Sequence, residues 1–160
     1  MTHDEPNPSR RGFLDAAARL TGIGVLVLMV DARTARATPT SMLAAMKKVI
    51  GEAALHKGKV QLELPPLVEN GNSVTMTVSV ESPMTAEDHV KAIHVFNEKN
   101  PQPNVIGVRL GPRAGRAAFS TRIRLADSQK IIAVAEMSDG SFWSDETDVI
   151  VTMAACVEVL

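Results

Sequence analysis

The chain has 160 residues, of which 45% are hydrophobic and 22% are charged, and its formal net charge at pH 7 is −1. The near-neutral charge argues against a nucleic-acid-binding protein, because such proteins need clustered positive charge for the phosphates. The only cysteine, Cys156, leaves no partner for an internal disulfide and too few ligands for a cysteine-based structural zinc site.

The first 37 residues have the features of a leader for twin-arginine export. Arg10 and Arg11 precede a mildly apolar stretch over residues 20–30, and a small-residue cleavage pattern follows at 35–37. That stretch is too short for the roughly 20 apolar residues that span a bilayer, so no membrane anchor is predicted. The alternative is an ordinary amphipathic first helix. We predict cleavage after Ala37 and a periplasmic location.

A short helix is predicted over residues 42–50, where apolar side chains recur at the spacing of one helical face. Either Thr40 or Ser41 can cap its start, and Gly51 or Gly58 can end it. The residues expected on the buried face are Leu43, Met46, Val49 and Ile50. We expect this helix to pack on the domain as a lid.

From residue 59 onward the pattern changes to short strands bounded by turn residues. In residues 73–80, apolar residues alternate with Thr and Ser, and Asp139-Gly140 is a strong hairpin signal before Phe142-Trp143. The predicted strands are 59–64, 73–80, 90–96, 105–110, 117–125, 130–137 and a final strand at about 147–153.

About seven strands at regular spacing predict an all-β fold, an immunoglobulin-like antiparallel sandwich with a short N-terminal helix. The paired cysteines of antibody domains are absent, so the sandwich would lack their disulfide. We predict three parts: a signal peptide over 1–37, the sandwich domain over 38–153, and a C-terminal arm over 154–160 that carries Cys156.

Catalytic and metal-binding patterns are sparse. The mature chain has three histidines, and His89 and His94 would lie on opposite faces of one strand, so we expect solvated surface histidines rather than a metal site. His56 is expected to be a surface residue as well. No glycine-rich phosphate loop and no local Ser-His-Asp spacing occurs. We therefore predict no catalytic residue, no metal and no cofactor.

Two sets of charged residues are either solvated surface or docking surface. An acidic set near the C-terminal strand is a loop and strand edge or a place where a partner docks: Asp139, Asp145, Glu146 and Asp148. A basic face is ordinary surface or attracts an anionic substrate or partner: Arg109, Arg113, Arg116, Arg122 and Arg124.

Cys156 is either a small buried apolar residue at a strand end or a reactive thiol. A thiol with the ordinary pKa of about 8.5 is only slightly ionised at neutral pH. The nearby Glu158 would raise that pKa rather than lower it. If Cys156 reacts, another protein must supply the base, the positive field or the metal.

Seven segments of the mature chain carry a family resemblance: 70–74, 82–85, 88–94, 98–101, 110–115, 120–126 and 134–143. They resemble SoxY, the sulfur-carrier subunit of the periplasmic thiosulfate-oxidising system. The resemblance extends over essentially the whole mature chain and includes the twin-arginine leader.

The resemblance implies an immunoglobulin-like sandwich paired with a SoxZ-like subunit, and a C-terminal arm whose cysteine, Cys156, carries the substrate. It further implies a haem-containing enzyme that conjugates thiosulfate to the cysteine, a hydrolase that releases sulfate, and a sulfur dehydrogenase. The carrier itself is not an enzyme.

One departure falls on the arm. The family's arm places glycines around the cysteine, whereas here Ala154-Ala155 precede Cys156 and residues 157–160 read Val-Glu-Val-Leu. Alanine restricts the backbone where glycine does not. The alternative to a carrier is therefore a divergent periplasmic binding or interaction module of the same fold, in which Cys156 is structural.

Overall fold

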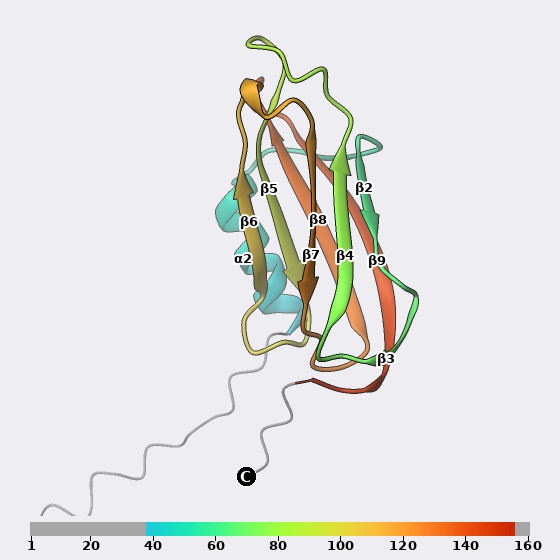
Figure 1. Ribbon diagram of the computed structural model, residues 1–160. Coiled ribbons are helices and arrows are strands. Elements are labelled where there is room, and N and C mark those ends of the chain that lie inside the picture. The colour runs from blue at the N-terminus through green and yellow to red at the C-terminus, as the bar shows by residue number, and fades with distance from the viewer. Residues whose placement is uncertain (1–37, 156–160) are drawn as a thin grey trace, which may run out of the picture. The chain divides into compact units, whose positions relative to one another are not determined.

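The computed structural model describes residues 38–155 (Figure 1). Arg10, Arg11, the cleavage site after Ala37, and Cys156 lie outside these residues. The elements in chain order are α2 (Pro39–Ile50), β1 (Leu55–Lys57), β2 (Val60–Glu63), β3 (Leu67–Asn70), β4 (Val74–Val80), β5 (Val90–Asn97), β6 (Asn104–Arg109), a 3-10 turn (Pro112–Ala114), β7 (Ala117–Ile123), β8 (Gln129–Met137) and β9 (Phe142–Met153).

The strands form two sheets that pack face to face (Figure 1). One sheet has the order β1-β9-β8-β5-β6, with β3 also pairing with β9, and the other has the order β2-β4-β7. This arrangement confirms the predicted all-β, immunoglobulin-like sandwich. No helix within residues 38–155 is long and apolar enough to cross a membrane.

Strand β4 shows why the alternating pattern predicts this fold. Its apolar residues Val74, Met76, Val78 and Val80 are buried between the sheets, and Met76 and Val78 are fully inaccessible to solvent. The threonines and serine between them face away from the core. Since side chains alternate across a strand, one face supplies the core and the other stays polar.

The helix is confirmed, but its cap and one buried residue were predicted wrongly. Thr38 is the N-cap: its hydroxyl accepts a hydrogen bond from the Ser41 amide at 3.1 Å, and the Ser41 hydroxyl accepts one from the Thr38 amide at 2.7 Å. Pro39 therefore occupies the first turn, where its missing N–H has no cost. With the helix starting earlier, Met42 faces the core and Leu43 is exposed.

Helix α2 covers the outer face of the larger sheet (Figure 1). Met42, Ala45 and Met46 pack against a second apolar cluster that includes Phe96 and Phe142. The C-cap Gly51 has φ of 63°, a left-handed conformation that favours glycine. The helix thus acts as the predicted lid.

The strand count was too low. Strands β1 and β3 were not predicted, and the last strand is longer than expected because β9 runs without interruption from Phe142 to Met153. Both short strands pair with β9 in parallel, β1 with its start and β3 with its end. These two pairs make the larger sheet mixed rather than wholly antiparallel.

Asp145 joins the two sheets. Its carboxylate accepts a hydrogen bond of 2.9 Å from the backbone amide of Leu62, which lies in β2 of the smaller sheet. Replacing Asp145 by Ala leaves that partly buried amide without its charged acceptor. We expect the free energy of unfolding to fall by about 1–3 kcal/mol in urea denaturation.

Asp148→Ala is the matched control for this change. Asp148 lies on the same strand, its side chain is 77% exposed, and its contact is an ion pair with Lys130. Such surface pairs contribute about 0–1 kcal/mol. Equal losses in the two variants would contradict the role given to Asp145.

Candidate functional site

Two backbone hydrogen bonds attach the end of β9 and the residues after it to the sandwich, a third joins their two partner segments, and we call this arrangement the arm root. The Gly71 amide donates to the Met153 carbonyl at 2.8 Å, and the Leu125 amide donates to the Gly71 carbonyl at 2.9 Å. The Ala155 amide then donates to the Leu125 carbonyl at 2.9 Å. Three segments that are distant in sequence therefore meet where the described chain ends.

Gly71 has no room for a side chain at the arm root. A Cβ placed on it would lie 2.4 Å from the Leu125 carbonyl oxygen, 2.9 Å from the Ala155 nitrogen and 3.1 Å from the Met153 carbonyl oxygen. All three contacts are with backbone atoms, which cannot move aside as the end of a flexible side chain can. This position requires glycine because of close backbone approach.

Side chains hold the preceding residues of β9 from both sides. The Val151 amide donates to the Ser128 hydroxyl at 2.9 Å, and the Thr152 hydroxyl donates to the Glu69 carbonyl at 3.1 Å. Ala155 itself is 1% exposed. The chain is therefore held through Ala155, the residue directly before Cys156.

Cys156 lies outside the described residues, so its exposure and its role as an attachment site stay predictions. The structure shows how the residue directly before Cys156 is held: Ala155 is buried, and its amide is hydrogen-bonded. Sequence reasoning missed the arm root. Asn70-Gly71 resembles an ordinary turn, and the partners of Gly71 are some 50 to 80 residues further along the chain.

The histidines occupy separate environments. His56 is exposed and its ring centroid lies 5.2 Å from that of Trp143, while His94 lies on β5 near Phe96 with a centroid distance of 6.3 Å. The Nδ1 atom of His89 is buried without a hydrogen-bond partner in the described part of the chain. Between residues 38 and 155, no three His, Cys, Asp or Glu side chains are grouped so that they could hold a metal ion.

His94 is expected to make the stability of the sandwich depend on pH. Burial lowers the pKa of His94 below its ordinary value, Glu136 opposes this, and Arg109 adds to it. The unfolded chain therefore takes up this proton at higher pH than the folded one does. Stability should fall as pH drops through about 6.5 towards the lower folded-state pKa, and should be unaffected by this group above that range.

Urea unfolding of the wild type and of His94→Gln at pH 7.5 and pH 5.5 measures this effect. We expect the wild type to lose more stability between the two pH values than the variant does. Equal losses would show that His94 does not contribute.

Most side chains of the acidic set make contacts within the domain. Asp145 binds the Leu62 amide, and Glu146 pairs with Lys57 at 3.2 Å. Asp139 accepts from the Ser141 amide in the β8–β9 hairpin, which lowers the pKa of Asp139 through its hydrogen bonds with Ser141. These contacts favour a structural role over partner docking.

The basic residues do not form one face. Three lie at or after the end of β6, before β7 begins, and two lie at the far end of β7 (Figure 1). All five are exposed, and within residues 38–155 none of them pairs with a carboxylate, whereas several lysines do. The five are Arg109, Arg113 and Arg116 at one end, and Arg122 and Arg124 at the other.

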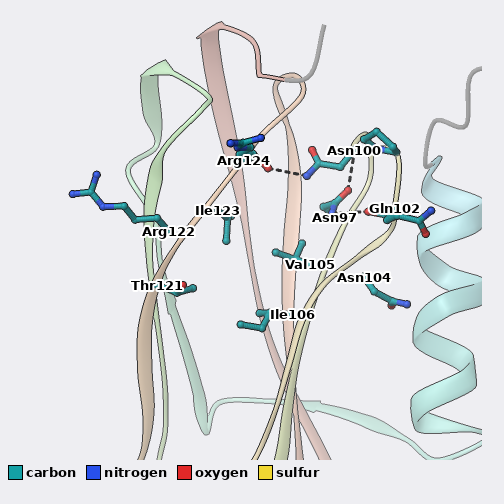
Figure 2. Close-up of a pocket in the computed structure, with 11 residues that line it drawn as sticks. Asn97, Asn100, Gln102, Asn104, Val105, Ile106, Thr121, Arg122, Ile123 and Arg124 are labelled. Atoms are coloured by element: carbon teal, nitrogen blue, oxygen red, sulfur yellow. Dashed lines mark hydrogen bonds between the residues drawn. The ribbon is translucent and has the colours of Figure 1, made fainter. Parts of the chain in front are cut away.

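A cavity of about 440 Å³, which we call the lateral pocket, lies between the start of β6 and the end of β7. Figure 2 shows Val105, Ile106 and Ile123 in the gap between the two strands, whereas Arg122 points away from it. The remaining lining residues are Asn97, Asn100, Pro101, Gln102, Asn104, Thr121 and Arg124.

The sequence matches the model of one known protein family. The family model described as sulfur oxidation protein SoxY matches residues 46–156, so the match begins within α2, spans the sandwich and ends on Cys156. A comparison with curated protein sequences finds no match.

Solved structures share the fold at low identity. The sulfur carrier protein SoxY from Chlorobium limicola f thiosulfatophilum is 23% identical with a TM-score of 0.61, covering 72% of this chain and 100% of that one. The superoxide reductase (neelaredoxin) from Ignicoccus hospitalis is 17% identical with a TM-score of 0.53, covering 72% and 94%. A putative superoxide reductase from Thermotoga maritima is 22% identical with a TM-score of 0.52, covering 62% and 93%. Since different functions share this sandwich, the fold alone does not decide between them.

Proposed function

Because the chain belongs to the SoxY family of sulfur oxidation proteins, we propose that it is a covalent carrier of sulfur intermediates, with the cargo attached to the Cys156 thiol. The observation that supports this most is the position of the only cysteine. Cys156 is the last residue of the family match and directly follows Ala155, which is hydrogen-bonded in the arm root.

The carrier does not catalyse its own loading. In the loading step the thiol and thiosulfate lose one proton and two electrons as a sulfur–sulfur bond forms, giving Cys–S–S–SO₃⁻. A haem-containing conjugating enzyme accepts the two electrons. In the release step, water attacks the terminal sulfur, sulfate and two protons leave, and Cys–S–S⁻ stays on the protein. A sulfur dehydrogenase would oxidise this remaining sulfur.

The position of the cysteine agrees with a carrier whose chemistry is supplied by partner enzymes. The only cysteine of the sequence directly follows Ala155, which is anchored through its backbone amide. The sandwich would hold the thiol at a defined starting point, while the partner enzymes supply the chemistry. A SoxZ-like subunit is the proposed heterodimer partner, and the twin-arginine leader over 1–37 would bring the protein to the periplasm.

The proposal is tested by loading the carrier in vitro. We expect the heterodimer, incubated with thiosulfate and the haem-containing enzyme, to gain the mass of the thiosulfate adduct, and the Cys156→Ser heterodimer to gain none. An unchanged mass in the wild type under conditions that load an authentic SoxY would contradict the proposal.

A further inference from the structure

Four residues follow Cys156 in the sequence, and we call them the tail; they lie outside the family match. The match ends on Cys156, and the next residues are Val157, Glu158, Val159 and Leu160. Three of them are apolar and one is acidic. A segment of this composition can bind a site that offers apolar side chains and a positive charge.

The lateral pocket lies next to the point where this tail begins. Ala155 is bonded to the Leu125 carbonyl, and the neighbouring residue Arg124 lines the pocket. The Asn100 side-chain amide donates to the Arg124 carbonyl at 2.7 Å (Figure 2). This bond connects the wall of the pocket that contains Asn100 to the segment that contains Arg124 and Leu125. Five residues in extended form reach about 16 Å, and they start from Ala155, whose bonding partner Leu125 directly follows the pocket residue Arg124.

The chemistry of the pocket complements that of the tail. Its interior presents Val105, Ile106 and Ile123, of which the first two are only partly buried. At its rim the exposed Arg124 has no acidic partner among residues 38–155. Apolar side chains gain about 25 cal/mol per Å² when they leave water, and an unpaired guanidinium binds carboxylates well.

We propose that residues 157–160 bind in the lateral pocket, with their apolar side chains on Val105, Ile106 and Ile123 and with Glu158 beside Arg124. Binding of the tail would keep the adjacent Cys156 close to the sandwich. This binding does not depend on the proposed carrier function, because it would occur whether or not Cys156 is loaded.

Disulfide cross-linking tests the position of the tail. In the full chain with Cys156→Ser, the pair Asn104→Cys and Val159→Cys places one thiol at the pocket and one on the tail. The control pair is Thr75→Cys with Val159→Cys. Thr75 is opposite Arg122 in the β4–β7 pairing and exposed on the outer face, so it lies at the same end of the sandwich but outside the pocket.

We expect the Asn104 pair to form an intramolecular disulfide at least ten times faster than the Thr75 pair. Equal rates would overturn the proposal. A disulfide that forms only between two copies would overturn it as well, because the occupant would then be the tail of a second molecule.

A charge exchange gives a second readout at Cys156 itself. Arg124→Glu or Glu158→Arg alone should speed alkylation by neutral iodoacetamide several-fold, with rates compared per thiolate from their pH profiles. The double exchange should return the rate towards wild type. Arg122→Glu is the control, since Arg122 points away from the pocket and donates to Ser73. Equal rates in all variants would contradict a bound tail.

Discussion

Gly71→Ala is expected to lower the free energy of unfolding by about 2–4 kcal/mol, among the largest effects of a single methyl group in this chain. The added Cβ would lie 2.4 Å from the Leu125 carbonyl oxygen, so the backbone has to separate there. Separation breaks the hydrogen bonds that hold Met153 and Ala155. Urea denaturation measures the loss, and amide hydrogen exchange at Ala155 shows whether the arm root opens.

Gly111→Ala is the matched control. Gly111 precedes the 3-10 turn with φ of −152°, and a Cβ there meets nothing within 4 Å. Its free energy of unfolding should change by less than about 0.5 kcal/mol. If Gly71→Ala were as mild as Gly111→Ala, the close packing of the arm root would be contradicted.

Cys156→Ser is expected to reduce thiosulfate oxidation by cells to the level of a strain without the protein. Serine keeps the size of the side chain and removes the sulfur that would form the bond to the cargo. The purified variant should fold normally and still pair with the proposed SoxZ-like subunit, because every strand of the described sandwich lies before Cys156 in the chain. Thiosulfate consumption by a complemented deletion strain measures the effect.

The competing interpretation predicts a different result for this position. If Cys156 were a buried structural residue, Cys156→Ala would lower stability by roughly 1 kcal/mol or more and leave thiosulfate oxidation intact. A carrier predicts the reverse: little change in stability and complete loss of oxidation. Measuring both quantities on the same variant separates the two.

The sequence predicts the strands whose two faces differ in polarity. Strand β4 is the clearest case, because its buried apolar residues alternate with Thr and Ser. The Asp139-Gly140 hairpin was also predicted correctly, since Gly140 adopts φ of 83° in the turn between β8 and β9. A local sequence pattern is sufficient to predict a strand or turn whose geometry is determined by neighbouring residues.

The parts that sequence reasoning missed depend on distant residues. Strand β1 is exposed along its whole length and exists because it pairs with β9, more than 80 residues later. The need for glycine at position 71 comes from Leu125 and Ala155. The arginines look like one face in the sequence, yet β7 separates Arg113 from Arg124. None of these relations leaves a periodic signal in the chain.

The most direct test of the account is the mass of the C-terminal peptide from protein purified out of cells that are oxidising thiosulfate. The account predicts that a fraction of these peptides carries sulfane or thiosulfonate adducts on Cys156, that reducing agent removes the adducts, and that cells without thiosulfate lack them. Peptides with only unmodified Cys156 in such cells, while an authentic SoxY in the same experiment is loaded, would contradict it.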